Sequence, residues 1–291
     1  MSGKSSPKIR WAVTGASVRG ANHTRNHRPN QDAIAWQTGA RVGAPAVLVV
    51  ADGHGAARYV RSHRGAKLAV QIAKDLLAGF ADEHEKTRDL ARLARLAGEQ
   101  LPRSLVRAWQ DQVRAELAVR PLSPAEEARW LDDRKPDAVR DPLRVYGSTL
   151  VAAVLTHRYL LFCHLGDGDI LIVDAEGSVT RPPLPVDTRL VANQTTSLCG
   201  PDAWNDMRVY FQPLTDKPPA LVMLATDGYA NSFADEAGFF ATASDLLRAF
   251  QTNGVQHTAN RLPHWLHATS EGGSGDDISV GLAYRLTGER A

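Results

Sequence analysis

Continuous apolar runs along the chain predict β-strands that are buried on both faces. The clearest of these runs are AVLVVAD (46–52), STLVAAVL (148–155), RYLLFCHL (158–165) and ALVMLATDG (220–228). Weaker runs with strand character lie at 11–18, 32–36, 169–174, 207–214 and 278–286. From their order we expect 11–18 to be an edge strand that pairs with 32–36. We also expect a meander of 148–155, 158–165 and 169–174.

Apolar residues at helical spacing predict helices in two groups, one in the first half of the chain and one near its end. The predicted helices lie at about 57–79, 84–118 (broken near Gly98 and Pro102), 235–252 and 255–268. Ser123 and Glu126 form a capping box, with a proline at the first helical position. This box predicts a further short helix that includes Trp130, followed by a surface loop at 132–142.

The separation of strands from helices predicts an α+β fold and not an alternating parallel sheet. We expect an α-β-β-α sandwich, in which two antiparallel β-sheets are flanked by helices. The chain contains no repeat and no linker that would divide it, so residues 1–291 are interpreted as a single domain. Its core covers about 9–286, with the helical segment 84–131 inside it.

The charge balance gives no support to nucleic-acid binding, since 34 Lys and Arg residues nearly balance 32 Asp and Glu residues. No apolar run approaches the roughly 18 residues of a membrane span, and no apolar segment follows the first lysines as in a secretory signal. The two cysteines, Cys163 and Cys199, exclude a disulfide scaffold and favour a reducing compartment. We therefore expect a cytoplasmic protein without a membrane or nucleic-acid partner.

Acidic residues lie at the ends of predicted strands or beside them in five places. They are NQD at Asp32, ADGHG at Asp52 and Gly53, GDGD at Asp167–Asp169, ATDG at Asp227, and GDDIS at Asp276 and Asp277. Carboxylates that meet where strands end would repel one another unless cations neutralise them. Oxygen ligands suit Mg²⁺ and Mn²⁺, and two such ions about 4 Å apart commonly hydrolyse phosphate esters. These residues therefore favour a metal-dependent phosphohydrolase.

The order and spacing of these motifs resembles the metal-dependent serine/threonine protein phosphatases of the type 2C class, and most closely a bacterial branch. The resemblance runs from about Val13 to Ala283. Its six motifs are GANHTRNHRPNQDA (20–33), VVADGHG (49–55), YGSTLVAAVL (146–155), HLGDGDILIV (164–173), MLATDGYANSF (223–233) and GDDISVGL (275–282). Each motif alone is weak evidence, whereas six in the family's order are specific.

The resemblance implies a site for two Mn²⁺ or Mg²⁺ ions. Asp32 and Asp52 would hold the ions, with Asp52 bridging them, and the carbonyl of Gly53 would join the second ion. Asp227 and Asp276 would complete the shell of the first ion.

Three further acids have weaker assignments. Asp141 could hold a third, weaker ion, although a plain loop residue is the simpler interpretation. Asp167 is interpreted as structural, with its carboxylate bonding backbone amides, and Asp277 as a residue that holds its own loop.

The resemblance also implies two catalytic residues. His54 matches the family's candidate general acid, for which a pKa near neutral is suitable, unless it is only a turn residue. Arg28 matches the phosphate-binding arginine at a slightly shifted position, with Arg25 as second choice and a solvated loop arginine as the alternative. Gln31 stands where many relatives have glutamate, which should alter a water-mediated contact.

The function implied by the resemblance is hydrolysis of phosphoserine or phosphothreonine in proteins by a hydroxide bound to two metal ions. Its partner would be a phosphorylated protein, such as a Ser/Thr kinase or the targets of one. Two alternatives stay open. One is a pseudophosphatase that recognises a phosphoprotein or kinase, suggested by Gln31 and the shifted arginine. The other is a metal-dependent hydrolase of a different phosphate ester.

Overall fold

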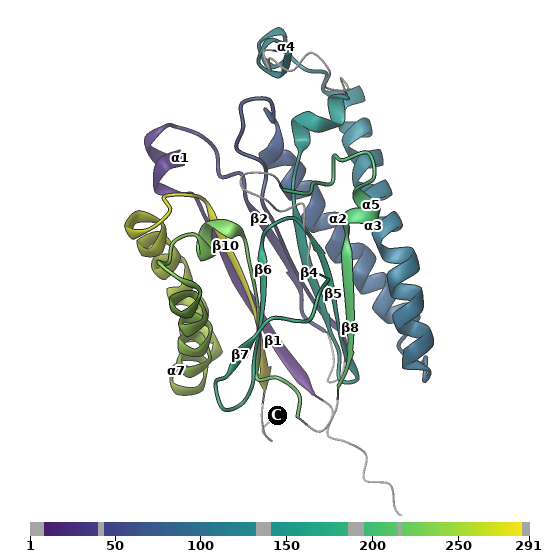
Figure 1. Cartoon of the computed structure of the whole chain (residues 1–291), viewed down its shortest axis with the longest axis vertical. Helices are drawn as coiled ribbons and strands as arrows, with labels where there is room; N and C mark the ends of the chain where they lie inside the picture. The colour runs from purple at the N-terminus through teal and green to yellow at the C-terminus, as the bar shows by residue number, and fades with distance from the viewer. Residues whose placement is uncertain (1–8, 40–43, 132–140, 186–194, 215–216, 287–291) are drawn as a thin grey trace, which may run out of the picture.

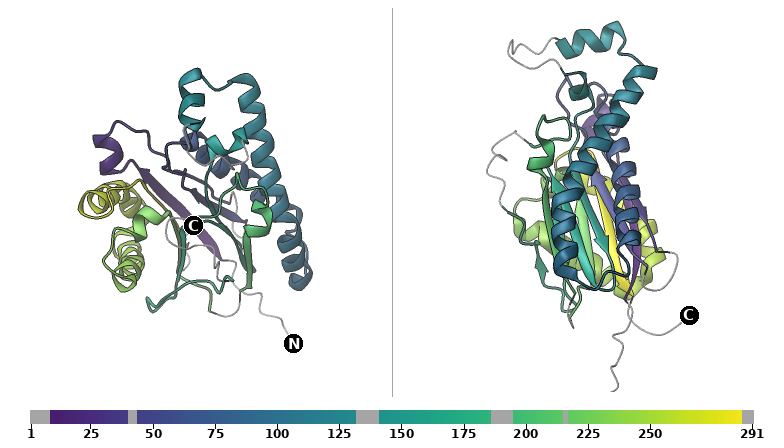
Figure 2. Two further views of the ribbon diagram at one scale, coloured as in Figure 1. Left: turned by 45° about the horizontal axis from the view of Figure 1, so that its top comes forward. Right: turned by 90° about the vertical axis from the view of Figure 1, so that its right-hand side faces the viewer.

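The computed structural model describes residues 9–39, 44–131, 141–185, 195–214 and 217–286. Its strands form two five-stranded sheets that pack face to face (Figure 1). Helices α2 and α3 cover the outer face of one sheet, and α7 covers the outer face of the other (Figure 2). The predicted α-β-β-α sandwich is confirmed.

Neighbouring strands run antiparallel in both sheets. The first sheet has the order β1-β10-β9-β6-β7 and consists of β1 (Arg10–Val18), β10 (Ile278–Leu286), β9 (Leu221–Ala225), β6 (Asp169–Val173) and β7 (Val179–Thr180). The second has the order β2-β3-β4-β5-β8 and consists of β2 (Ala33–Gln37), β3 (Ala46–Ala51), β4 (Leu150–Leu155), β5 (Tyr159–Leu165) and β8 (Arg208–Pro213).

Two strand pairings differ from the prediction. β1 pairs with β10, while β2 pairs with β3 in the other sheet. β6 leaves the expected meander to pair with β9, and β5 pairs with β8 on its free side. Gly166, whose φ is 105°, turns the chain from β5 toward β6, a conformation that glycine adopts without steric cost. A run of buried residues does not reveal which sheet a strand joins, because both faces of each strand are covered.

The inner faces of the two sheets form a dry apolar layer. Leu48 and Val50 of β3 lie in one cluster with Phe162 of β5 and with Val222 and Leu224 of β9, and all five are fully buried. The alternate residues of β3 face the helices instead. Because the strands are buried on both faces, their sequences are continuous apolar runs. The packed core also holds the ends of the strands in place.

Helix α2 (Ser62–Glu83) lies on the second sheet and begins later than the predicted 57–79. Its buried side includes Ala66, Ala69 and Ala73, each at most 2 % exposed. The first turn of α2 therefore follows a loop of several residues after the ADGHG motif, and this loop forms part of the site described below.

Helix α3 (Leu90–Val119) is continuous, so the predicted break near Gly98 and Pro102 is wrong. A proline inside a helix costs about 3 kcal/mol, because it removes a backbone hydrogen bond and crowds the preceding turn. Leu101 and Leu105 stay buried on either side of Pro102. Their packing against the core offsets the cost of the proline.

The other predicted helices are present. In α4 (Pro124–Leu131), Glu126 accepts the N–H of Ser123 at 2.9 Å, and the Ser123 hydroxyl accepts the N–H of Glu126 at 3.3 Å. The long helix α7 (Glu236–Gly272) is kinked at Gly254, whose φ is 80°, and so corresponds to the two helices predicted there. The remaining short helices are α1 (Ala21–Arg25), the 3₁₀ helix η1 (Pro142–Tyr146), α5 (Ala203–Asp206) and α6 (Asp227–Ala230).

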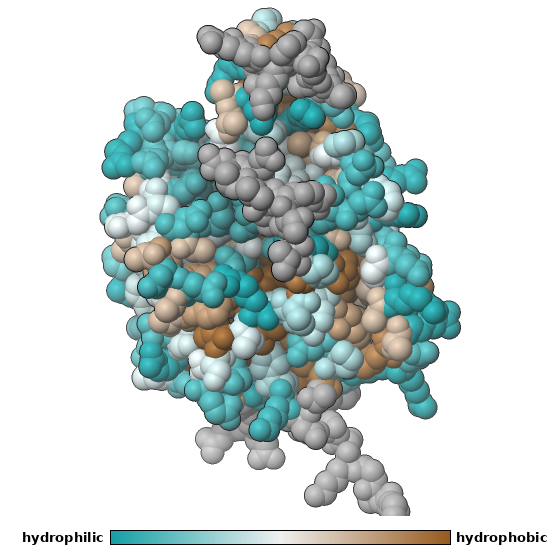
Figure 3. Space-filling view, viewed as in Figure 1, coloured by the Kyte–Doolittle hydropathy of each residue, from teal (hydrophilic) through white to brown (hydrophobic). Residues whose placement is uncertain are grey.

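The outward surfaces of α3 and α7 are mainly hydrophilic, as expected for helices that cover a sheet (Figure 3). Among the helices in the described ranges, none has the length and apolar character needed to cross a bilayer. Most of the loop predicted at 132–142 lies outside the described residues.

Candidate metal centre

Three of the acidic strand ends converge at one end of the sandwich. Asp52 directly follows β3, Asp167 lies in the turn between β5 and β6, and Asp227 comes two residues after the end of β9. One carboxylate oxygen from each of the three lies within 4.8 Å of the other two. Because β3 and β9 belong to different sheets, this cluster forms at the seam between them. Asp167, interpreted from the sequence as structural, also belongs to this group, which makes it a further candidate ligand.

Asp32 lies at the same end of the fold, immediately before β2, and is only 4 % exposed. Its Oδ2 accepts a hydrogen bond from the hydroxyl of Thr226 at 2.6 Å. The same hydroxyl accepts the backbone N–H of Ser279 on β10 at 2.9 Å. Thr226 thereby fixes Asp32 relative to Asp227, the next residue along the chain. Sequence analysis did not identify this threonine, and its place in the ATDG motif is the signal that contained it.

The negative charges of the carboxylates in this cluster repel one another, which opposes their ionisation. Burial raises the pKa of Asp52 well above its usual range, and the charges of other carboxylates, Asp32 first, raise it further. Burial and then the charge of Asp167 raise the pKa of Asp227 to about 7. Bound cations would relieve this repulsion. The donor set consists of oxygen atoms, which fits Mg²⁺ or Mn²⁺.

Asp277 organises the segment that leads to Asp32. It is 3 % exposed and accepts the backbone N–H groups of Gly20 and Gln31, both at 2.6 Å. Its Oδ2 also lies 2.7 Å from Nδ1 of His23 on α1. These contacts tie α1 and the residue before Asp32 to the start of β10, a wider role than holding its own loop.

Asp276 is exposed and lies outside the group formed by Asp52, Asp167 and Asp227. Its Oδ1 accepts the backbone N–H of Asp277 at 2.8 Å. Its negative charge still raises the pKa of Asp227, though less than burial does. Asp276 is therefore near the cluster, and its assignment as a metal ligand stays a prediction.

Gly53 occupies a position where a side chain would not fit. An added Cβ would lie 2.6 Å from the carbonyl oxygen of Ser62 and 2.7 Å from that of Gln31. The N–H of Gly53 donates to the same Gln31 carbonyl at 3.1 Å, which links the loop after β3 to the segment before β2. The predicted role of the Gly53 carbonyl as a ligand stays a prediction.

His54 is buried beside this loop. Its backbone N–H donates to the carbonyl of Gly147 at 3.1 Å, and its ring packs edge-on against Tyr59 with 4.7 Å between ring centroids. Burial first, and then the positive charge of Arg58, lower the pKa of His54 to about 4. The imidazole is therefore neutral at pH 7, in contrast to the near-neutral pKa expected from the sequence.

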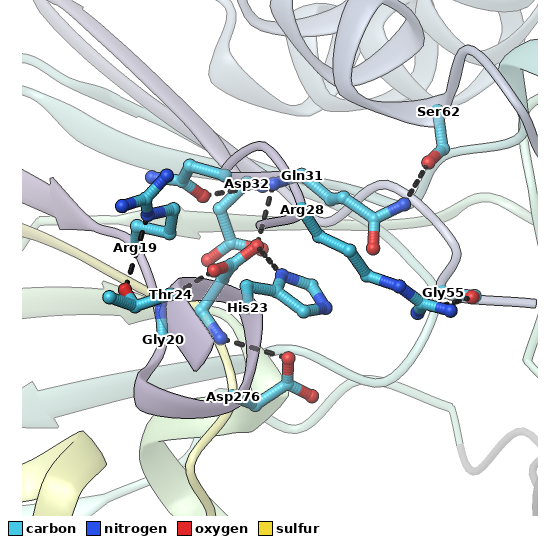
Figure 4. Close-up of polar contacts among 12 residues, drawn as sticks. Arg19, Gly20, His23, Thr24, Arg28, Gln31, Asp32, Gly55, Ser62 and Asp276 are labelled. Atoms are coloured by element: carbon cyan, nitrogen blue, oxygen red, sulfur yellow. Dashed lines mark hydrogen bonds and ion pairs between the residues drawn. The ribbon is translucent and has the colours of Figure 1, made fainter. Parts of the chain in front are cut away.

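The two candidate arginines differ in their contacts. Arg28 lies on the loop after α1, with its Nη1 3.5 Å from the carbonyl oxygen of Gly55 (Figure 4). Arg25 donates to the side chain of Asn22 within α1 at 2.5 Å. Arg28 thus lies against the loop that follows His54, and its assignment as the phosphate-binding arginine stays a prediction.

Asp141 caps a helix and lies in none of the candidate metal groups formed by described residues. Its carboxylate accepts the backbone N–H of Leu143 at 2.9 Å, at the start of η1. The assignment of a third, weaker ion to Asp141 stays a prediction.

Solved structures share this fold. The catalytic domain of the serine/threonine protein phosphatase PstP, in complex with two manganese ions, matches with a TM-score of 0.57 and 19 % identity, over 96 % of this chain and 100 % of that chain. PstP/Ppp of Mycobacterium tuberculosis matches with a TM-score of 0.54 and 18 % identity, over 95 % and 98 % of the two chains. The phosphatase Stp1 of Staphylococcus aureus matches with a TM-score of 0.58 and 14 % identity, over 99 % and 100 %.

The sequence comparisons give the family. No curated protein matches significantly. The sequence profile described as Protein phosphatase 2C matches residues 19–267, which is most of the chain and includes Asp32, Asp52, Asp167 and Asp227. The resemblance inferred from the six motifs is confirmed, and the chain belongs to the protein phosphatase 2C family.

Proposed function

We propose that this phosphatase hydrolyses phosphoserine and phosphothreonine in proteins with the help of two Mn²⁺ or Mg²⁺ ions. The observation that carries the proposal is the convergence of Asp52, Asp167 and Asp227 from strand ends of both sheets within 4.8 Å. Membership of the protein phosphatase 2C family supports it. PstP, which shares the fold, holds two manganese ions.

The proposed metal residues are Asp32, Asp52, Asp227, Asp276 and the carbonyl of Gly53, with Asp167 as an additional candidate. Bound cations would lower the pKa of a water molecule and offset the charge of the phosphate. The chain supports this site through Thr226, whose hydrogen bond orients the Asp32 carboxylate.

Arg28 and His54 act on the substrate in this proposal. Arg28 binds phosphate oxygens through its guanidinium, which can donate two parallel hydrogen bonds. Only three residues separate it from Asp32, so the phosphate is held beside the metal residues. A neutral His54 carries one ring N–H, which donates a hydrogen bond to the leaving oxygen.

The substrate in this proposal is a phosphorylated protein, either a Ser/Thr kinase or a target of one, encountered in the cytoplasm during signalling. The family match and the acid cluster support the phosphoprotein class of substrate.

Phosphate release from a phosphothreonine peptide tests the proposal. Mn²⁺ added to the metal-free protein should start the release, and excess chelator should stop it. Asp52→Asn should lower kcat/KM at least about a hundredfold, because it removes a central carboxylate of the cluster. Asp82→Asn, at an exposed position of α2, is the matched control and should leave kcat/KM unchanged. Full activity in chelator would refute the proposal, and metal binding without turnover would instead identify a pseudophosphatase.

A further inference from the structure

A cavity of about 360 Å³ opens beside the proposed metal residues. Its walls come from the loop after α1, the loop after His54, the start of α2 and helix α4. The lining includes Arg28, Gln31, Gly55, Tyr59, His63 and Arg129. Gln31 directly precedes Asp32, and Gly55 directly follows His54, so the cavity is bounded by the segments that carry Asp32 and His54.

The cavity is basic. None of the lining residues within the described ranges is Asp or Glu. Within the described part of the chain, neither Arg28 nor Arg129 forms an ion pair with a carboxylate. The pKa of His63 is lowered, first by burial and then by the positive charges of Lys67 and Arg64. Cationic groups that lack acidic partners in the protein favour an anionic ligand.

Gln31 lines the cavity, and its amide oxygen is a buried hydrogen-bond acceptor. Its Nε2 donates to Ser62 Oγ at 2.6 Å (Figure 4). It also donates to the carbonyl of His54 at 3.2 Å, and the two bonds fix the orientation of the amide. Its Oε1 is buried, and no described residue donates to it. A buried acceptor of this kind needs a donor from a ligand or from water.

Helix α4, which carries Arg129, is anchored by the buried side chain of Arg61. The guanidinium donates to the two carboxylate oxygens of Glu126 at 2.8 and 2.9 Å. It also donates to the carbonyls of Arg120 and Pro121 at 2.7 and 2.9 Å, just before the helix begins. Arg129 lies three residues after Glu126, on the same side of the helix. The cavity arginine is therefore carried by an element with a fixed position.

We propose that this cavity binds an anionic side chain of the substrate protein, a carboxylate or a second phosphate, close in sequence to the phosphorylated residue that is hydrolysed. The inference rests on the proposed function. Arg129 pairs with this second anion, and Arg28 holds the reacting phosphate. An extended peptide advances about 3.3 Å per residue, and Arg28 lines the same cavity as Arg129, so the second anion is expected within a few residues of the reacting one.

Three matched phosphothreonine peptides test the inference. One has neutral flanking residues, one has glutamates there, and one has a second phosphothreonine two positions away. With Mn²⁺, the unmodified protein should hydrolyse at least one of the anionic peptides with roughly fivefold higher kcat/KM than the neutral one, mainly through KM. A gain for both shows that charge suffices, and a gain for one alone identifies carboxylate or phosphate as the ligand. The gain should shrink at high salt.

Arg129→Gln should abolish this preference and leave hydrolysis of the neutral peptide unchanged. It should also leave hydrolysis of para-nitrophenyl phosphate unchanged, because that substrate has no flanking chain. Arg95→Gln, at an exposed position of α3, is the matched control and should keep the preference. Equal kcat/KM for all three peptides, or a preference that survives in Arg129→Gln, would overturn the inference and leave the proposed function intact.

Absence of hydrolysis for every peptide would refute the proposed function but would still leave the cavity open to a direct test. Fluorescence anisotropy then compares binding of the same three peptides to the unmodified protein and to Arg129→Gln. Tighter binding of an anionic peptide that is lost in the variant supports the cavity assignment. Equal binding of all three peptides overturns it.

Discussion

The buried charge of Arg61 is neutralised inside the protein, whereas the half-buried carboxylate of Asp52 lies among other carboxylates. Arg61 is 7 % exposed, and its guanidinium is bonded to Glu126, to the hydroxyl of Tyr146 and to two carbonyl groups. For Asp52, burial and the charges of other carboxylates act together against ionisation. A charge that is paired within the chain supports the structure, and a charge opposed by its neighbours is suited to bind a ligand.

The pKa values show the same contrast. The hydrogen bonds from Arg61 lower the pKa of Glu126 to about 2, and those bonds raise the pKa of Arg61, so both stay charged. Burial instead raises the pKa of Asp52 and Asp227. The Arg61 region is thus expected to add stability to the metal-free protein. The acid cluster is expected to reduce that stability in exchange for cation binding.

Replacing Arg61 with methionine should cause the largest change. It removes the donors that Glu126 and two backbone carbonyls now use, so we expect the free energy of unfolding to fall by about 3 kcal/mol. Denaturant unfolding of the metal-free protein measures this loss. Arg114→Met, which breaks an exposed ion pair with Asp111, is the control and should cost less than about 0.5 kcal/mol. If both variants lose the same free energy of unfolding, the contacts of Arg61 stabilise the protein no more than an exposed ion pair does.

Thr226→Val tests whether the acid cluster depends on the hydrogen bond to Asp32. The variant keeps the size of the side chain and loses the hydroxyl, so the affinity for Mn²⁺ should fall about tenfold to a hundredfold. Thr226→Ser keeps the hydroxyl and should bind Mn²⁺ nearly as tightly as the unmodified protein. Isothermal titration calorimetry measures both. A valine variant that binds as tightly as the serine variant would show that Thr226 does not orient the ligand.

The sequence predicts the strand ends of the acid cluster because a buried apolar run followed by an aspartate is a local pattern. AVLVVAD and ALVMLATDG each combine a buried run with a terminal acid, and the structure brings Asp52 and Asp227 together. Asp167 carries the same signal after β5 and could have been included as a ligand. Which strands pair is not a local property: β1 and β10 come from opposite ends of the chain. Nothing in either run specifies that contact.

The Arg61 region could not be predicted in the same way. Arg61 is one of many arginines in the sequence, and its partner Glu126 is 65 positions away. The capping box already gives Glu126 a local role, so the sequence offers no reason to seek a second one. Burial of one particular arginine follows from how α2, α4 and η1 meet, which depends on tertiary packing.

Asp227→Asn should make the metal-free protein more stable at pH 8. Burial raises the pKa of Asp227 from 3.8 to about 7 in the folded chain, so ionisation between those values disfavours folding. The gain should be about 1–2 kcal/mol at pH 8 and near zero at about pH 3, below both pKa values, where the carboxyl is largely protonated in both states. Saturating Mn²⁺ should reverse the order, because the unmodified protein binds it more tightly. Thermal unfolding measures the stability of both proteins against pH. If the two curves run parallel, ionisation of Asp227 does not oppose folding, and the proposed repulsion in the cluster is wrong.

The opposite pH dependence, with the smallest effect, is expected at Glu126. Its pKa is lowered from 4.5 to about 2 by Arg61, so its contribution to stability is complete above 4.5 and is lost as the pH falls toward 2. The side chain is 29 % exposed, and solvent screening limits the contribution to about 1 kcal/mol. Glu126→Gln should remove this part of the acid dependence, whereas Glu127→Gln, at an exposed position of the same helix, should not. Unfolding midpoints between pH 2.5 and 6 compare the two variants. If their profiles coincide, the charge of the Arg61–Glu126 pair adds no stability. The two regions would then differ in their hydrogen-bond contacts but not in how their charges affect folding.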